Sequence, residues 1–336
     1  MDQQTPKVSI VTSMYNHRPF LERRVESVLS QTLQNWEWIV VDDCSKDGSY
    51  EYLCSLAQKD RRVTILKNDQ NRNTPYSMHR ALQLAQGEFL YRMDSDDYCA
   101  PRFLERMVGV LESHPSVVMA HCRGLYLDQE DGTWGGWPKK KEYVVSGWDE
   151  FRRILLDYHI KSPTLLFRRQ TVMEAGGFSV LPLRCAYDWH LSLRACLLGD
   201  VAFIDEPLTA HRRHGSNVSG DMKRQVDARQ TELETFGVID EVISHVSHEH
   251  THEVKGLQQA AYRRSASALL PVVRWARANS MELQAEELEQ MIEKYVPLAE
   301  VSSSLRKPGV RSWLMEAATH LIKSFTYHKL PPVRQN

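Results

Sequence analysis

The first hundred residues alternate between strand-like and helix-like segments, and polar residues follow each strand-like segment. Residues 7–13 form one apolar run, and residues 36–41 form a second, which ends at Asp42 and Asp43. Residues 20–29, between the two runs, have the spacing of an amphipathic helix. The order strand, helix, strand is typical of open α/β sheets, which bind ligands at the carboxyl ends of their strands. We therefore expect an α/β fold with a binding crevice at these strand ends.

A third apolar run, residues 88–91, ends in a cluster of carboxylates. Asp94, Asp96 and Asp97 follow it directly. In an extended backbone, residues i and i+2 project to the same side, so Asp94 and Asp96 are expected to face one ligand while Asp97 turns away. Mg²⁺ or Mn²⁺ held by one or two carboxylates usually completes its shell with substrate phosphates. The cluster is consistent with a metal-bound diphosphate, and also with a solvated loop that only caps a turn.

Four segments of the amino-terminal half resemble, in order and spacing, the nucleotide-binding half of the inverting family 2 glycosyltransferases with the GT-A fold. They are VSIVTSMYN (8–16), IVVDDCSKDGS (39–49), AQGE (85–88) and MDSDD (93–97). Four later segments resemble the acceptor half of that family: FRR (167–169), GGF (176–178), DWHL (188–191) and the run from Pro207 to Ser219. The resemblance implies a GT-A catalytic domain over residues 1–220, with a nucleotide half (1–100) and an acceptor half (101–220). A helical region (221–336) is expected to follow.

The resemblance also assigns chemical roles. It implies that Asp96 and His214 hold Mn²⁺ or Mg²⁺, that Asp94 and Ser95 lie at the nucleotide, and that Asp188 is the general base. Asp188 also has the alternative role of capping a helix over residues 190–198.

Two positions depart from the family pattern. Tyr187 stands where the family usually has an acidic residue, and Met78 stands where many relatives have an arginine that touches the diphosphate. Arg72, Arg80 and Arg92 are candidates to replace that arginine, and the sequence does not choose among them.

For the nucleotide, the resemblance places Ser13, Tyr15 and Asn16 at the base and ribose, and Asp43 as the acceptor of a ring N3–H. Uracil and thymine carry that donor and cytosine does not. A UDP-sugar, and next a dTDP-sugar, is therefore the expected donor. The acceptor is expected to be a hydroxyl of a glycan or a lipid-linked glycan in the synthesis of surface polysaccharide.

Residues 128–141 read as a polar, glycine-rich surface loop. Trp134 and Trp137 on this loop, and Trp189 further on, are candidates to stack on an acceptor sugar, with packing against the protein body as the alternative. Lys139, Lys140 and Lys141 read as a solvated turn or as contacts to an anionic acceptor.

The carboxyl-terminal region reads as helices, including amphipathic segments at residues 282–295 and 313–325. These helices are expected to pack on the catalytic domain, to pair with a second copy of the chain, or to rest on a membrane surface. The region also holds His245, His248, His250 and His252, which read as a polar linker, with metal binding as the alternative.

Composition is that of an ordinary globular enzyme. Charged residues make up 25% of the 336 residues, the formal net charge is −1, and no basic patch indicates a nucleic-acid partner. The six cysteines lack a C-x-x-C pair, which favours a reducing compartment. We see no signal peptide or apolar run of about 18 residues, so we expect a cytoplasmic protein, free or held on the cytoplasmic face of the inner membrane.

Other classes of function fit less well. A dinucleotide oxidoreductase needs a G-x-G-x-x-G motif after the first strand, where this chain has Met14-Tyr15-Asn16-His17. Because Tyr187 and Met78 depart from the family pattern, the alternative to an enzyme is a catalytically inert sugar-nucleotide-binding or scaffold protein.

Overall fold

The computed structural model describes residues 5–128, 132–178, 181–212 and 226–304. The chain divides into two compact units, Met1–Arg212 and Arg213–Asn336. The first unit is an α/β unit, and the described part of the second is helical.

The first unit is built on one ten-stranded mixed sheet. Its amino-terminal half consists of parallel strands, and its second half mixes parallel and antiparallel pairs. The main order is β3 (Val63–Lys67), β2 (Trp36–Asp42), β1 (Val8–Met14), β4 (Phe89–Arg92), β9 (Leu165–Arg168), β6 (Val117–Leu127), β10 (Asp200–Arg212) and β5 (Tyr98–Cys99). Two short strands lie off this path: β7 (Thr133–Gly136) pairs with β6, and β8 (Tyr143–Val145) pairs with β10.

One face of the sheet carries the main hydrophobic core. It packs against α1 (Leu21–Leu29), α2 (Ser49–Ala57) and α4 (Phe103–Ser113). In α1, Leu21, Val25 and Val28 are buried, which is the spacing of one helix face. Because side chains alternate along a strand, Val8, Ile10 and Met14 of β1 point into this same core.

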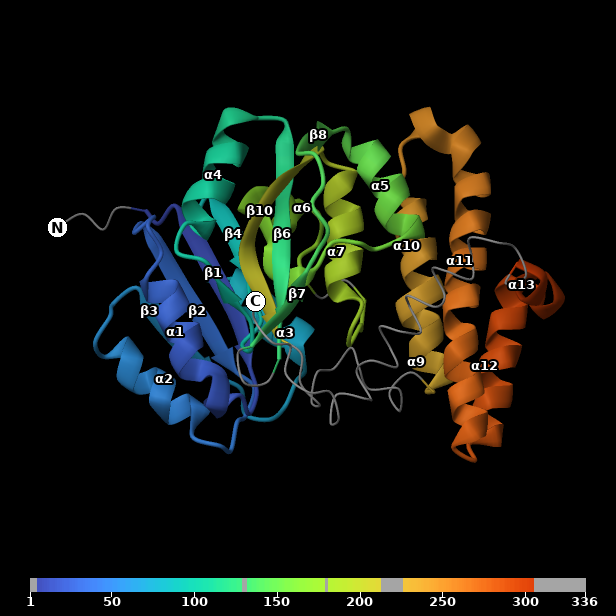
Figure 1. The fold of residues 1–336 in the computed structure, drawn as a ribbon, viewed down its shortest axis with the longest axis horizontal. Coiled ribbons are helices and arrows are strands. Elements are labelled where there is room, and N and C mark those ends of the chain that lie inside the picture. The colour runs from blue at the N-terminus through green and yellow to red at the C-terminus, as the bar shows by residue number, and fades with distance from the viewer. Residues whose placement is uncertain (1–4, 129–131, 179–180, 213–225, 305–336) are drawn as a thin grey trace, which may run out of the picture. The chain divides into compact units, whose positions relative to one another are not determined.

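The other helices of the first unit are α3 (Thr74–Leu82), α5 (Gly147–Leu156), α6 (Arg169–Glu174) and α7 (Tyr187–Cys196). In Figure 1, α4 lies on one side of β6 and β10, and α5 and α7 lie on the other. α5 and α7 pack against each other. Met78 of α3 is fully buried. The methionine that replaces the family's arginine therefore lies in the interior, away from any ligand.

The second unit consists of α9 (Ala228–Glu232), a π-helical turn η4 (Leu233–Gly237), α10 (Val238–Ser244), η5 (His248–His250), α11 (Thr251–Ala278), α12 (Glu282–Tyr295) and α13 (Leu298–Ser304). Its core includes Phe236, whose ring stacks on that of Tyr295 with the centroids 4.1 Å apart. α12 has the predicted bounds, and Leu283 in its first turn is 64% exposed. The predicted segment 313–325 lies outside the described residues.

Two local expectations differ from the structure. Residues 128–141 are not only a loop, because they contain β7, which extends the sheet through β6. α7 begins at Tyr187, so Asp188 lies in the first turn of the helix and does not cap it. Within the described ranges, no helix combines the length and the apolar character needed to cross a membrane.

Candidate active site

The carboxyl ends of three parallel strands meet at one edge of the sheet. Met14 of β1 is in register with Asp42 of β2, and Val11 of β1 with Arg92 of β4. Backbone hydrogen bonds continue this alignment past the strand ends, because Asp43 N donates to Met14 O at 2.7 Å and Met93 N donates to Val11 O at 3.1 Å. The residues that follow these strands, at positions 15–17, 43–47 and 93–97, are thus gathered at one edge, as the order of elements predicts.

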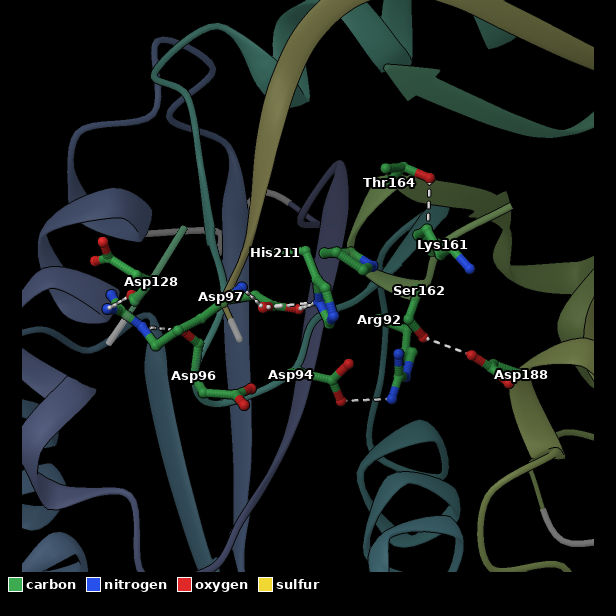
Figure 2. A network of polar contacts seen from close by, with 12 residues as sticks. Arg92, Asp94, Asp96, Asp97, Asp128, Lys161, Ser162, Thr164, Asp188 and His211 are labelled. Carbon is green, nitrogen blue, oxygen red and sulfur yellow. Dashed lines mark hydrogen bonds and ion pairs between the residues drawn. The ribbon is translucent and has the colours of Figure 1, made fainter. Parts of the chain in front are cut away.

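The carboxylates after β4 point in two directions. Figure 2 shows the carboxyl groups of Asp94 and Asp96 on one side of the loop, and that of Asp97 turned toward His211. Asp97 Oδ1 accepts a hydrogen bond from Arg212 N at 2.8 Å and lies 3.2 Å from His211 Nδ1. The Arg212 guanidinium donates to the backbone oxygen of Asp96 at 3.0 Å. The end of β10 therefore fixes this loop, and Asp97 serves that attachment.

Arg92 links the carboxylate cluster to α7. Its side chain is 4% exposed, and Nη2 donates both to Asp94 Oδ1, at 2.5 Å, and to the hydroxyl of Tyr187. Its Nε and Nη1 are buried and have no hydrogen-bond partner among the described residues. Although burial works to lower the pKa of Arg92, the charge of Asp94 and the neighbouring Tyr187 and Asp188 raise it. Arg92 is therefore a permanent cation within the cluster.

Asp94 is the strongly perturbed carboxyl of this cluster. The surrounding protein displaces water and raises its pKa to about 7, against the attraction of Arg92, and the charges of Asp97, Asp96 and Asp188 raise it further. Like charges held this close repel one another, so the group takes up a proton more readily. A perturbed carboxyl in a polar cluster is a common mark of a functional site.

Asp188 lies across from this cluster in the first turn of α7 and is partly exposed. Its Oδ2 accepts a hydrogen bond from Ser162 Oγ at 3.0 Å, and its Oδ1 accepts one from Trp189 N at 2.8 Å. Figure 2 shows Ser162 between Arg92 and Asp188. The fold thus brings the predicted base of the second half to the carboxylates of the first.

Asp43, the predicted contact to the base, is held at one oxygen. Its Oδ1 accepts from Asn68 Nδ2 at 2.7 Å and from Arg72 N at 2.7 Å. Asn68 is oriented in turn by Arg80, whose Nη1 donates to Asn68 Oδ1 at 2.7 Å. Asp43 is only 2% exposed, and its Oδ2 has no hydrogen-bond partner among the described residues. The arrangement leaves that oxygen for a ligand.

The remaining residues predicted to bind the nucleotide differ in their exposure and in their hydrogen bonds. Tyr15 is 45% exposed and Ser13 is 7% exposed. Asn16 accepts from Lys46 N at 2.8 Å through its side chain, and its backbone N donates to Ser45 Oγ at 3.0 Å. Ser95 Oγ lies 2.5 Å from His17 Nδ1. Asn16 and Ser95 therefore join neighbouring loops at this edge of the sheet to one another.

A sequence model of glycosyl transferase family 2 matches residues 9–176. The chain belongs to glycosyl transferase family 2. Among curated relatives, EpsE of Bacillus subtilis (strain 168), named as a glycosyltransferase, is 37% identical over 125 residues, which are 37% of this chain and 45% of EpsE. TuaG of the same organism, named for teichuronic acid biosynthesis, is 36% identical over 133 residues, which are 40% of this chain and 52% of TuaG. The chain thus spans about half the length of these relatives.

Solved structures share the fold. S. aureus TarS 1–349, in complex with UDP-GlcNAc, aligns with a TM-score of 0.55 and 18% identity over 86% of this chain and 91% of that one. The mannosyltransferase PcManGT from Pyrobaculum calidifontis, in complex with GDP-Man and Mn²⁺, aligns with a TM-score of 0.55 and 17% identity over 96% of this chain and 86% of that one. The predicted α/β class with the GT-A fold and carboxyl-terminal helices is confirmed.

Two of the tryptophans predicted from the sequence to stack on an acceptor sugar, Trp189 and Trp137, have different surroundings. Trp189 Nε1 donates to the backbone oxygen of Ile154 at 2.8 Å, so this indole is attached to α5. Trp137 lies beside β6 and lines a cavity. For Trp134 only the backbone is described, in β7, and His214 lies outside the described residues.

The four clustered histidines of the second unit lie at the end of α10, in η5 and in the first turn of α11. Among the described residues they do not form a group of three or more ligands close enough to share one metal ion. The described side chains that approach closely enough to hold a metal ion together are His121, Glu150 and His159 of the first unit. The fold brings these three side chains together although they are far apart in the sequence.

Sequence reasoning missed the residues that connect the two halves of the site. Arg92 was one of three undifferentiated arginines, and Ser162 and His211 received no role. The spacing of Arg92 and Asp94, which places them on one side of an extended segment, was a usable signal for that pair. The contacts of Ser162 to Asp188 and of His211 to Asp97 join residues 26 and 114 positions apart, and no local pattern predicts them.

Proposed function

We propose that this family 2 member transfers a sugar from a nucleoside diphosphate donor to a hydroxyl of a glycan or lipid-linked acceptor, with inversion at the anomeric carbon. A UDP-sugar is the favoured donor, a dTDP-sugar the next, and surface polysaccharide synthesis the setting. One observation carries the proposal. Arg92 holds Asp94 and contacts Tyr187, the residue before Asp188, so that a carboxylate cluster suited to a metal-bound diphosphate lies next to a carboxylate suited to a base.

The cluster fits a divalent cation. Asp94 and Asp96 point to one side. Burial, and after it the charges of Asp97, Asp96 and Asp188, raise the pKa of Asp94 to about 7 against the attraction of Arg92, and a bound cation would relieve the repulsion among these carboxylates. We propose that Asp96 and Asp94 hold Mn²⁺ or Mg²⁺, with His214 as a further ligand. When bound, the ion would neutralise charge on the leaving diphosphate. Arg92, as a permanent cation, orients Asp94 through its hydrogen bond and opposes the protonation that the other neighbours favour.

Asp188 is proposed as the general base. Inverting transfer needs a group that takes the proton of the attacking hydroxyl on the face opposite the diphosphate. The Asp188 carboxylate is held at both oxygens, by Ser162 Oγ and Trp189 N, and is partly exposed, so it is oriented and reachable. A carboxylate oxygen has more than one lone pair, and these contacts leave acceptor capacity for a substrate hydroxyl.

Asp43 supports the choice of nucleotide. Its Oδ2 would accept the N3–H of uracil or thymine, while Asn68 and Arg72 N hold the side chain in place. The structural neighbours were solved with UDP-GlcNAc and with GDP-Man, so the shared fold accepts more than one base. We propose that Ser13 and Tyr15 contact the base and ribose.

Calorimetric binding of UDP, dTDP, GDP and CDP, each with Mn²⁺ and with a chelator, tests the proposal. We expect UDP or dTDP to bind in preference to the others, and only with Mn²⁺. No binding of any nucleotide would contradict it. The alternative is an inert scaffold that binds sugar nucleotides. It would also bind UDP. The rate at which UDP is released from a UDP-sugar in the presence of acceptor would then be the same with and without a substitution of Asp188.

A further inference from the structure

A cavity lies within the first unit, beside β6 and β10. It has a volume of about 160 Å³. Liquid water occupies about 30 Å³ per molecule, so the cavity has room for roughly five waters or one small chemical group. Ligand pockets for whole small molecules are larger, from about 300 Å³ upward. We call it the β6 cavity, and it is sized for one substituent or one ring of a larger ligand.

The walls of the β6 cavity are basic and aromatic. Arg123, Lys140 and Lys161 line it, and none of the described residues that line it is a carboxylate. Asp205 offsets one of these charges, because Arg123 Nε lies 2.7 Å from its Oδ1. Lys140 is exposed and has no ion pair with any described residue. The cavity thus carries a positive potential, which favours a negatively charged ligand.

The buried carboxylate beneath the β6 cavity does not cancel the positive charge of its walls. This residue, Glu150, is fully buried and is neutralised by its neighbours: Oε1 lies 3.1 Å from His159 Nε2 and accepts from the Tyr143 hydroxyl at 3.3 Å, and Oε2 accepts from Arg153 Nη1 at 3.2 Å. His121 lies 3.1 Å from the same hydroxyl. Burial lowers the pKa of His121 to about 3, so this ring is neutral near pH 7.

His121, Glu150 and His159 are also close enough to share a metal ion. The surroundings argue against a cation there, because Arg153 already pairs with Glu150 and two lysines line the space above. Both oxygens of the carboxylate already have hydrogen-bond or ion-pair partners. The charge of the β6 cavity therefore selects an anion.

Trp137 forms an aromatic wall held in a fixed position. Its ring lies over Gly124 of β6, where an added Cβ would come within 2.4 Å of the ring. Trp137 N donates to Gly124 O at 3.1 Å, and the ring meets Tyr126 edge-on with centroids 5.8 Å apart. The buried indole N–H has no acceptor among the described residues. A rigid aromatic face beside cations suits a sugar ring that bears an acid group.

The β6 cavity shares a wall with the proposed catalytic centre. Lys161 and Thr164 line it, and Ser162, between them in the chain, donates to Asp188. Figure 2 shows Lys161, Ser162 and Thr164 on one short segment beside Asp188. A ligand with one group in the β6 cavity therefore has its adjacent part at the segment that holds the base.

We propose that the β6 cavity binds an acid group of the acceptor, a carboxylate or a phosphate, and so selects an anionic glycan as substrate. The inference rests on the proposed glycosyl transfer, with Asp188 as base. Lys140 and Lys161 attract the anion, Arg123 adds donors, and Trp137 covers the adjoining ring. The acceptor class is thus acidic rather than neutral.

The test uses the full-length protein and four small probes in ligand-observed NMR: glucuronate and glycerol 3-phosphate, with glucose and glycerol as neutral counterparts. The variants are Lys140→Glu and, as a matched control, Lys139→Glu. Lys139 is exposed, is adjacent in the chain and does not line the β6 cavity, so both variants make the same change of charge on one loop.

We expect one or both anions to bind and the neutral probes not to bind. Lys140→Glu should weaken anion binding roughly tenfold, and Lys139→Glu should change it by less than about twofold, because attraction falls steeply with distance in salt water. The anion that binds more tightly identifies the acid group. Binding of neither anion, equal binding of glucose, or equal effects of the two variants would overturn the proposal.

Nucleotide binding separates this result from failure of the proposed function. UDP binding with Mn²⁺ is measured by calorimetry on the same three proteins and should be equal in all of them. If UDP binds and the anions do not, the acceptor inference fails alone. If UDP does not bind to the unmodified protein, the proposed function fails whatever the anions do.

Discussion

Ser162 Oγ donates a hydrogen bond to Asp188 Oδ2 at 3.0 Å. This contact joins the segment before β9 to the first turn of α7, and it orients the one acidic side chain proposed to act on the acceptor. Because Trp189 N holds the other oxygen, at 2.8 Å, the carboxylate has little freedom to rotate. The position of the base thus depends on two elements that meet only in the folded chain.

Asp188→Asn should lower turnover at least about 100-fold while leaving donor affinity unchanged, as expected for loss of a general base. The amide keeps the size of the side chain and removes its basicity, and its one oxygen replaces one of the two carboxylate acceptors, those for Ser162 Oγ and Trp189 N. Turnover is measured as UDP release with saturating acceptor, and donor affinity by calorimetry. Ser162→Ala, which keeps the carboxylate, should cost much less. Near-normal turnover of Asp188→Asn would place the base elsewhere.

Asp96→Ala should abolish metal-dependent nucleotide binding, because it removes a proposed ligand of the ion that holds the diphosphate. Asp97→Asn is the matched control. Asp97 is engaged by Arg212 N and His211, and the amide oxygen of asparagine can still accept from Arg212 N. UDP affinity is measured with and without Mn²⁺ for both variants. Retained Mn²⁺-dependent binding in Asp96→Ala, or its loss in both variants, would contradict the assignment.

Tyr187→Phe should destabilise the first unit by about 1 to 3 kcal/mol, because it removes an acceptor from the buried Arg92 guanidinium while the ring packing remains. The free energy of unfolding is obtained from urea titration. Tyr158→Phe is the control, since the Tyr158 hydroxyl lies 3.4 Å from the uncharged Ser192 Oγ and its loss should cost less. An equal loss of unfolding free energy in both variants would show that the hydrogen bond to Arg92 stabilises the fold no more than the contact to Ser192.

Local sequence patterns were enough to predict the fold of the amino-terminal half and the carboxylates of the site that follow its strands. The periodicity of residues 7–13, 20–29 and 36–41 predicted β1, α1 and β2 to within about a residue, because local burial patterns determine them. The two-residue alternation placed Asp94 and Asp96 on one side. The partners of those carboxylates come from β10 and α7, and their contacts depend on how distant elements pack. The β6 cavity is unpredictable from sequence for the same reason. Lys140 belongs to a run that the sequence indicates is a solvated turn, and only the fold places Trp137 and Lys161 around the same cavity.

His121 should make the protein sensitive to acid. Its pKa is about 3 in the folded chain because of burial, opposed by the charge of Glu150, and about 6.5 when unfolded. Below about pH 6.5 the unfolded chain binds a proton that the folded chain does not bind until about pH 3, so stability falls as pH drops through this window. At about pH 5 the expected loss from this group alone is about 2 kcal/mol relative to pH 7.5.

His121→Phe isolates this contribution, because it removes the titrating group and keeps a ring against Phe203, whose centroid lies 4.9 Å from that of His121. Urea unfolding at the two pH values gives the free energy for both proteins. The variant should lose about 2 kcal/mol less than the unmodified protein on acidification, whatever its stability at neutral pH. Equal losses would mean that His121 accepts a proton in the folded chain.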